Sequence, residues 1–194
     1  MNNKNITIIG LTGGIASGKS SVLEEFKKLG VKIISVDDVS REVFYSNGVK
    51  EKIQNSFKTL ERKKIAEIIF SNSGKKRILE RIMHPVIIRE LKKIILAHRK
   101  KGKGMLVADV PLLFEAKLEK IFDSIIVVSC RKDQQIKRLA EREKISKREA
   151  VKRINSQIPL SEKVKMADFV IDNSKSKKEL KFKIEKMLDK IIQF

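Results

Sequence analysis

Short apolar runs recur along the chain, separated by longer segments in which apolar positions repeat every three or four residues. Four runs, at 6–11, 104–110, 124–129 and 168–172, are rich in Ile and Val and lack clean polar alternation, and 31–36 is a candidate fifth. Strands covered on both faces of a parallel sheet have this composition. We therefore expect five buried strands at these positions.

The segments between the runs are amphipathic and predict helices. The apolar residues between 22 and 29 fall on one helical face, and that pattern ends at Gly30, a residue typical of helix C-termini. The segment from Pro85 to Gly102 opens with proline and closes with glycine, which predicts a helix that begins at Pro85. Two further amphipathic segments lie at 132–144 and 176–194.

Strands that alternate with helices predict an α/β fold, with a parallel five-stranded sheet flanked by helices. The stretch at about 37–103 is mostly helical and is longer than a crossover between two strands needs. We interpret part of it as an inserted substrate-binding region within a single domain that spans 1–194.

Charge and cysteine content narrow the possible partners and location. The chain carries 44 Lys and Arg against 24 Asp and Glu, a formal charge of +20, which attracts nucleic acid, anionic membranes or phosphate-rich small molecules, although a solvated lysine surface explains it equally well. Cys130 is the one cysteine and cannot form an internal disulfide. Together with the absence of a long apolar run or signal-peptide pattern, this favours a soluble cytoplasmic protein.

One segment concentrates the glycines of this glycine-poor chain. GLTGGIASGKSS at 10–21 contains G-x-x-x-x-G-K-[ST] between an apolar run and an amphipathic segment. In such a phosphate loop the backbone N–H groups and a helix N-terminus hold phosphate oxygens, the lysine reaches the β- and γ-phosphates, and the hydroxyl ligates Mg²⁺. We predict that ATP phosphates bind here, with Ser20 as the metal ligand. The predicted contacts are Gly13, Gly14, Ile15, Ala16, Ser17, Gly18, Lys19, Ser20 and Ser21.

Two carboxylates follow predicted strands, at the edge of the sheet where ligands bind. Asp109 ends the run at 104–110 and is expected in the active site, the alternative being an ordinary loop contact. Asp37 follows the run at 31–36, where a carboxylate can orient an acceptor hydroxyl for phosphoryl transfer. Arg41 is four residues further on and shares its helical face. The alternative is that Asp37, or equally Asp38, caps a helix whose first turn pairs with Arg41.

Arginines gather after the strand predicted at 124–129. Small kinases close a basic lid over ATP, and its arginines neutralise the transferring phosphoryl group. Arg138 and Arg142 are spaced i,i+4 and are predicted to contact the ligand together. For Arg148 and Arg153 a solvated basic helix is the simpler interpretation.

Seven segments follow one another along the chain: IGLTGGIASGKSSV, VDDVSREVF, RKKIAEIIF, LERIMHPVI, VADVPLLFEAKLEKIFD, RLAERE and ADFVIDNS. In these segments the chain resembles the dephospho-CoA kinases, and the resemblance covers essentially its whole length. The resemblance implies ATP- and Mg²⁺-dependent phosphorylation of the 3′-hydroxyl of dephospho-CoA, the last step of coenzyme A synthesis. It also implies a phosphate-loop core at 1–36, 104–135 and 167–194, a helical CoA-binding region at about 37–103 and a lid at about 136–166.

The resemblance assigns roles to particular residues. It makes Asp37 the catalytic aspartate with Arg41 behind it and Arg142 the lid arginine, and it places Asn173 near the adenine. Ser35 stands where the family usually has the first aspartate of an Asp-x-Asp pair, so one carboxylate near the metal is missing. The residues implied on the acceptor side, in addition to Asp37, Arg41 and Asp109, are His84, Pro85, Pro111, Leu112, Leu113, Phe114 and Glu115.

Two other functions remain open at this point. One is phosphorylation of another small molecule or a nucleoside monophosphate. The other is ATP-dependent nucleic-acid binding, against which the chain has one Tyr, no Trp and no stacking motif. We expect ATP and dephospho-CoA as partners, no specific nucleic acid, no membrane, and a monomer or small homo-oligomer.

Overall fold

The computed structural model of the chain describes residues 6–100 and 104–192. It divides into two units, here called the sheet unit (1–34 and 101–194) and the helical unit (35–100). The elements of each unit pack around a core of their own.

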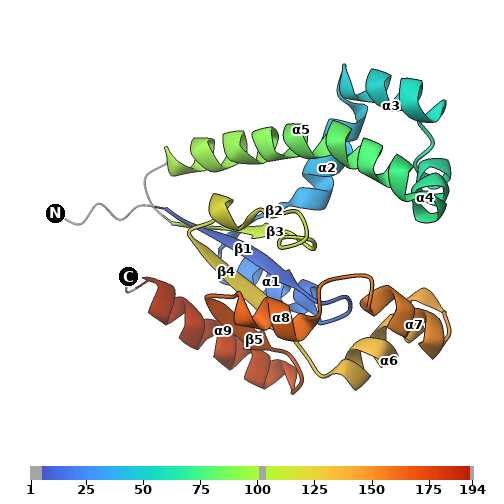
Figure 1. Cartoon of the computed structure of the whole chain (residues 1–194). Coiled ribbons are helices and arrows are strands. Elements are labelled where there is room, and N and C mark those ends of the chain that lie inside the picture. The colour runs from blue at the N-terminus through green and yellow to red at the C-terminus, as the bar shows by residue number, and fades with distance from the viewer. Residues whose placement is uncertain (1–5, 101–103, 193–194) are drawn as a thin grey trace. The chain divides into compact units, whose positions relative to one another are not determined.

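The strands of the sheet unit form one five-stranded sheet in the order β2-β3-β1-β4-β5 (Figure 1). β1 pairs with β3 and β4, and β4 pairs with β5, all in parallel. The five predicted strands are confirmed, with bounds shifted by at most two residues. These bounds are β1 Thr7–Gly13, β2 Lys32–Ser35, β3 Met105–Asp109, β4 Ser124–Ser129 and β5 Phe169–Asp172.

The register brings the candidate site to one edge of this sheet. Leu11 of β1 is aligned with Asp109 of β3, and Gly13 is aligned with Val128 of β4. The last residues of the three central strands therefore lie side by side, and the glycine-rich loop leaves the sheet at this edge.

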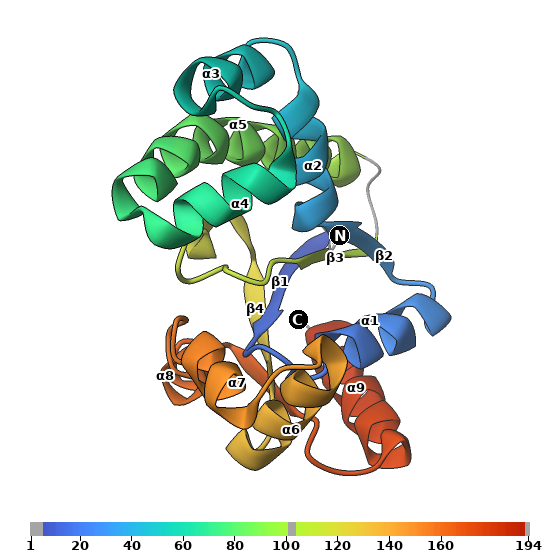
Figure 2. The ribbon, with the colours of Figure 1, turned by 90° about the vertical axis from the view of Figure 1, so that its right-hand side faces the viewer.

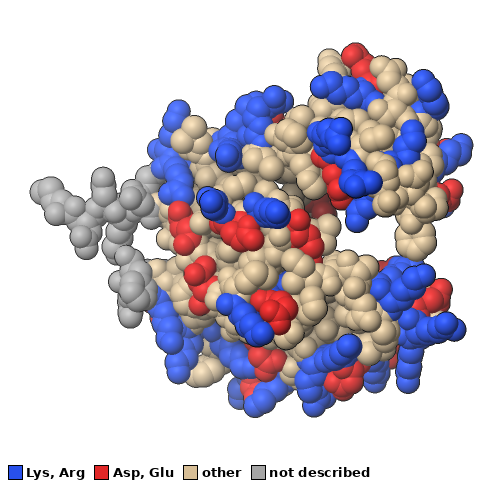
Figure 3. Space-filling view, in the orientation of Figure 1, with Lys and Arg blue, Asp and Glu red and all other residues tan. Residues whose placement is uncertain are grey.

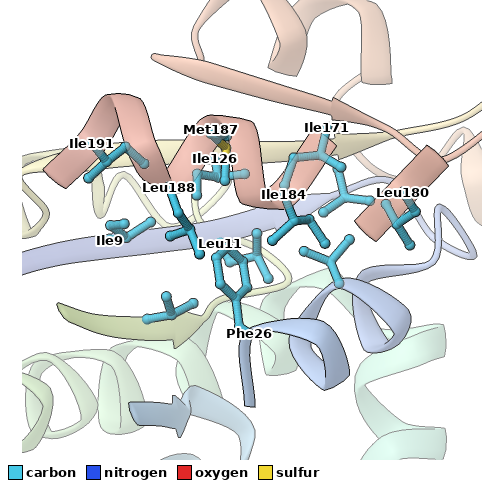
Figure 4. Close-up of a cluster of buried hydrophobic side chains, with 13 residues drawn as sticks. Ile9, Leu11, Phe26, Ile126, Ile171, Leu180, Ile184, Met187, Leu188 and Ile191 are labelled. Atoms are coloured by element: carbon cyan, nitrogen blue, oxygen red, sulfur yellow. The ribbon is translucent and has the colours of Figure 1, made fainter. Parts of the chain in front are cut away.

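Two helices cover one face of the sheet. The buried side of α1 (Lys19–Lys28) and that of α9 (Lys177–Ile192) meet the apolar side chains of the strands in one cluster, drawn in Figure 4. Burying these side chains contributes roughly 1.5–3 kcal/mol for each large one. The cluster consists of Ile9, Leu11, Val22, Phe26, Val107, Ile126, Val128, Ile171, Leu180, Ile184, Met187, Leu188 and Ile191.

The predicted end of α1 at Gly30 is confirmed. Gly30 has φ +77°, its N–H bonds the Lys27 carbonyl, and the Val31 N–H bonds the Phe26 carbonyl, both at 3.0 Å. This pair of bonds is a Schellman motif, which requires a left-handed residue after the helix.

The remaining helices of the sheet unit follow β4. α6 (Lys132–Glu143) and α7 (Lys147–Ile154) pack as a hairpin, and α8 (Leu160–Lys165) returns the chain to β4 (Figures 1 and 2). α7 begins with a capping box in which Ser146 and Glu149 satisfy each other's backbone N–H groups. A 3₁₀ turn at Glu119–Ile121 precedes β4.

The helical unit packs α2 (Val36–Tyr45), α3 (Val49–Phe57) and α4 (Arg62–Ser71) against the long helix α5 (Ser73–Arg99). The prediction that this stretch is mostly helical is confirmed. Its separate core contains Val39, Val43, Phe44, Val49, Ile53, Phe57, Ile65 and Met83.

The prediction that a helix begins at Pro85 is wrong. α5 begins twelve residues earlier, where the Asn72 side chain caps it by accepting the Lys75 N–H at 2.9 Å, and Pro85 lies inside the helix. An internal proline removes one backbone hydrogen bond and costs about 3 kcal/mol. Buried residues such as Met83 and Leu91, on both sides of the proline, keep α5 continuous. The predicted end at Gly102 lies outside the described residues.

Lys and Arg side chains are spread over the visible faces of both units, with Asp and Glu between them (Figure 3). The ion pairs at these surfaces join mostly exposed neighbours along one helix, such as Lys181 with Glu185 of α9 at 3.8 Å, and such pairs contribute little to stability. Within residues 6–100 and 104–192, no helix has both the length and the apolar character needed to cross a membrane.

Candidate active site

The glycine-rich loop encloses a small cavity where β1 passes into α1. The cavity has a volume of about 170 Å³ and is lined by loop residues together with two arginines of α6. The Ser17 N–H bonds the Gly14 carbonyl at 3.1 Å and closes the turn. The lining residues are Gly14, Ala16, Ser17, Gly18, Lys19, Ser20, Arg138 and Arg142.

Side chains from other elements hold two carbonyls of this loop. The Gln135 amide of α6 donates to the Ile15 carbonyl at 2.8 Å, and the Asn173 amide, just after β5, donates to the Ser17 carbonyl at 3.0 Å. In a trans peptide the N–H points opposite to the C=O. The N–H groups of Ala16 and Gly18 are therefore directed away from these partners. Both residues line the cavity, and backbone N–H groups at such a loop are suited to binding phosphate.

The loop is too tightly surrounded for larger residues at its two key glycines. A Cβ atom on Gly13 would lie 2.4 Å from the Val128 carbonyl oxygen, and one on Gly18 would lie 1.9 Å from the Asn173 amide nitrogen. Gly18 also has φ +94°. Ala16 adopts φ +57°, a left-handed conformation that costs a residue with a Cβ roughly 1–2 kcal/mol.

Arg138 and Arg142 both reach the cavity from α6, as their spacing predicts. The Arg138 guanidinium donates to the Asn173 carbonyl at 3.2 Å and approaches the Ser17 carbonyl at 3.5 Å. Arg142 pairs with Glu143 at 3.1 Å and is 61% exposed, so it is held less firmly than Arg138. Figure 2 shows the loop between β1 and α1 passing beside α6.

The donor set around the loop fits a metal ion that arrives with its nucleotide. Among the described residues, no group of three or more His, Cys, Asp or Glu could hold an ion. Mg²⁺ at phosphate-transfer sites takes few protein ligands and completes its shell with phosphate oxygens and water. The exposed Ser20 hydroxyl is suited to that role, and Asp109 lies half-buried at the end of β3.

The turn that follows β3 carries the segment PLLFE. Leu113 and Phe114 are buried in the sheet unit, whereas Leu112 is 48% exposed. Leu112 is therefore the apolar side chain of this segment that is available to a ligand, and Leu113 and Phe114 shape the turn from inside. The Thr12 hydroxyl donates to the Pro111 carbonyl at 3.2 Å and ties the turn to β1.

Glu115 ends this segment and forms an ion pair with Lys163 of α8 at 2.8 Å. The Lys163 side chain is fully buried. Sequence reasoning missed this lysine, because one lysine among so many carries no local signal of burial.

In the helical unit, Asp37 lies in the first turn of α2 and is exposed. The alternative that Asp37 or Asp38 caps this helix is wrong, because the cap is Ser35, whose hydroxyl accepts the Asp38 N–H at 3.2 Å. Arg41 pairs with Asp38 at 3.6 Å rather than with Asp37. The Asp37 carboxylate has no hydrogen-bond or ion-pair partner in the described part of the chain.

A second cavity, of about 270 Å³, lies within the helical unit and includes His84. Its walls are mostly apolar, and the Arg62 guanidinium lies 5.9 Å from the centroid of the Phe44 ring. Pro85 does not line this cavity. Sequence reasoning counted Arg62 within the family segment RKKIAEIIF but assigned no role to it. The lining residues are Ser40, Phe44, Arg62, Ile65, Ala66, Ile69, Leu79, Glu80, Met83, His84 and Ile87.

A parallel sheet whose central strand leads through a phosphate loop into a helix, with arginines over the loop, defines a P-loop kinase fold. The family model for dephospho-CoA kinase (CoaE) matches residues 7–179. The chain belongs to this family.

Individual relatives agree with the family assignment. A dephospho-CoA kinase from Carboxydothermus hydrogenoformans is 40% identical in an alignment 194 positions long. This alignment covers 95% of this chain and 94% of that protein. The solved structure of a dephospho-CoA kinase from Campylobacter jejuni is similar with a TM-score of 0.74 and 31% identity, covering 96% of this chain and 97% of the other. A Thermus thermophilus crystal structure has a TM-score of 0.81 at 25% identity, covering 96% and 98%.

Proposed function

We propose that the chain transfers the γ-phosphoryl group of ATP to the 3′-hydroxyl of dephospho-CoA and so forms coenzyme A. The observation that carries this proposal is the phosphate loop, with carbonyls held outward by Gln135 and Asn173, in a member of the dephospho-CoA kinase family.

On the ATP side, the N–H groups of Ala16 and Gly18 bind phosphate oxygens, and the Lys19 ammonium binds the β- and γ-phosphates. Arg138, fixed by the Asn173 carbonyl, keeps a positive charge at the cavity, and Arg142 approaches the transferring group when the α6–α7 hairpin closes as a lid. Closure excludes water and strengthens each of these charge interactions. Asn173 acts chiefly by orienting the loop, because its side-chain amide is engaged with Ser17.

Mg²⁺, when it is bound with ATP, supplies charge neutralisation at the phosphates, with the Ser20 hydroxyl as its protein ligand and Asp109 behind it. The missing carboxylate at Ser35 leaves this site with fewer anionic groups than the family pattern implies. We therefore expect the metal to depend strongly on the nucleotide for its affinity.

On the acceptor side, Asp37 accepts a hydrogen bond from the 3′-hydroxyl and orients its oxygen toward the γ-phosphorus. A carboxylate without an ion-pair partner is available for this task, whereas Asp38 is paired with Arg41. Leu112 and the cavity around His84 provide apolar contacts for dephospho-CoA, and Arg62 and Arg41 provide cations for its phosphates.

A cytoplasmic location is part of this proposal. Cys130 is a free, buried thiol, as expected in a reducing compartment.

The direct test is to mix the protein with MgATP and dephospho-CoA and to detect coenzyme A by mass spectrometry. We expect coenzyme A with the wild type and a loss of about 10²-fold or more in turnover with Lys19→Ala, because one charge-stabilising donor is removed. Nucleoside monophosphates and a dephospho-CoA analogue that lacks the 3′-hydroxyl serve as alternative acceptors. Phosphorylation of a nucleoside monophosphate without formation of coenzyme A would overturn the proposal.

A further inference from the structure

The sheet unit contains one fully buried lysine, Lys163, within the described residues of that unit. Its ammonium lies 2.8 Å from Oε1 of Glu115, whose side chain is 21% exposed. Taking an ammonium and a carboxylate out of water costs several kcal/mol for each ion, and their attraction only partly offsets this cost. Apolar residues of the same size at these two positions would give the protein at least the same stability. The ion pair therefore calls for an explanation other than stability.

The same carboxylate oxygen joins three segments of the chain. It accepts the backbone N–H of Ile158 at 3.1 Å and lies 2.8 Å from the Lys163 ammonium as its ion-pair partner. Glu115 belongs to the turn after β3, Ile158 lies between α7 and α8, and Lys163 is on α8. The pair therefore fixes the turn against the segment through which the α6–α7 hairpin returns to the sheet.

The position of Glu115 determines where Leu112 is presented. The Ala116 N–H bonds the Leu112 carbonyl at 2.9 Å, so the five residues from Leu112 to Ala116 form a closed helical-type turn. Leu113 and Phe114 are buried beneath it, and Leu112 is exposed. A displaced Glu115 would rotate this turn and move the Leu112 side chain.

We propose that Lys163 is a positioning residue for the acceptor substrate. Through Glu115 it holds the turn at 111–116 so that Leu112 contacts dephospho-CoA, a role that rests on the function proposed above. Lys163 itself touches no substrate.

The hydrogen bonds that hold the phosphate loop do not involve this pair. Its carbonyls are bonded by Gln135 and Asn173, and Asn173 by Arg138, none of which contacts Glu115 or Lys163 in any hydrogen bond of the described residues. Loss of the pair should therefore weaken the binding of dephospho-CoA far more than the binding of ATP. If the pair only stabilised the fold, its loss would not weaken the binding of one substrate more than that of the other.

The test compares three variants. They are Lys163→Met, the double variant Glu115→Gln/Lys163→Met, which is called the neutral pair, and the control Lys165→Met. Lys165 is on the same helix but is 70% exposed, with Glu162 as its partner. The Gln side chain keeps an oxygen that can accept the Ile158 N–H. Since removing one ion leaves the other buried and uncompensated, Lys163→Met lowers the Tm, whereas the neutral pair restores it.

We expect the KM for dephospho-CoA to rise about tenfold or more in Lys163→Met and in the neutral pair, since a displaced contact loses binding, while the KM for ATP changes less than about threefold. Lys165→Met leaves both values unchanged. The proposal is overturned if the neutral pair regains the wild-type KM for dephospho-CoA together with its Tm, or if both KM values rise equally. If Lys163→Met does not fold, the KM values of the neutral pair alone test the proposal.

Failure of the proposed function is recognised separately, as a wild type that makes no coenzyme A. The pair is then tested by amide hydrogen exchange at Ala116 and Leu118, whose N–H groups bond Leu112 and Leu113 within the turn. Faster exchange in the neutral pair than in Lys165→Met supports the positioning role, and equal exchange overturns it.

Discussion

The side-chain amide of Asn173 donates a hydrogen bond to the Ser17 carbonyl at 3.0 Å and so joins the end of β5 to the phosphate loop. Both residues are buried. The peptide that precedes Gly18 is thereby oriented by a residue far away in sequence, which makes nucleotide binding depend on the last strand of the sheet.

Replacing Asn173 should weaken ATP binding. Asn173→Ala removes the shorter of two hydrogen bonds to the buried Ser17 carbonyl and leaves it only the 3.5 Å contact from Arg138, which corresponds to about a fivefold to thirtyfold loss of affinity. Asn173→Asp should be worse, because it sets a carboxylate oxygen against the Ser17 carbonyl. Calorimetric titration with ATP measures both, and the same affinity in Asn173→Asp as in the wild type would contradict this role.

Gly18→Ala should weaken nucleotide binding strongly, since its Cβ would lie 1.9 Å from the Asn173 amide nitrogen at φ +94°. Gly30→Ala is the matched control. Gly30 also has a positive φ, +77°, but no atom lies within 4 Å of a Cβ there. We expect Gly18→Ala to lose about 10²-fold in kcat/KM for ATP through the misplaced loop. Gly30→Ala should lose only about 1 kcal/mol of stability, at unchanged kcat/KM.

Ala16→Gly should stabilise the protein. Ala16 is held at φ +57°, where glycine has no steric penalty. The relief is partly offset by the greater entropy of glycine in the unfolded chain, so we expect a gain of about 1 kcal/mol or less in the free energy of unfolding. Denaturant unfolding measures this gain. A lower stability of Ala16→Gly would show that the loop does not strain this residue.

Asp37→Asn should retain ATP affinity and lose phosphoryl transfer, because a neutral amide is a poorer acceptor for the 3′-hydroxyl proton. Asp38→Asn is the control, since Asp38 is the neighbouring carboxylate and pairs with Arg41 at the surface. Single-turnover kinetics with saturating ATP separates binding from transfer. The assignment of Asp37 is wrong if the two variants transfer phosphate equally fast.

The Cys130 thiol should react slowly with iodoacetamide in the folded protein. Burial raises its pKa above the ordinary thiol value, so at any given pH a smaller fraction is thiolate, the reactive form. The rate of alkylation should therefore begin to rise at a higher pH in the native chain than in the same chain unfolded in urea. Coincident pH profiles would contradict the effect of burial.

The phosphate loop could be predicted from a local sequence pattern. The spacing of Gly13, Gly18 and Lys19, with an apolar run before and an amphipathic segment after, predicts both the cavity and the two elements that form it. The strand positions were likewise predictable, because burial on both faces requires continuous apolar runs. The start of α5 at Ser73 was not predictable in this way, because the packing of α5 overrides the local start signal at Pro85.

The sequence by itself determined the α/β class, the phosphate loop and the resemblance that leads to the dephospho-CoA kinase family, because these depend on residues close together in the chain. Only the tertiary structure decided that Asn173 holds the Ser17 carbonyl and that Lys163 is buried against Glu115. Those contacts depend on which side chains the sheet brings together across long sequence separations, and hydrophobic periodicity contains no information about such pairs.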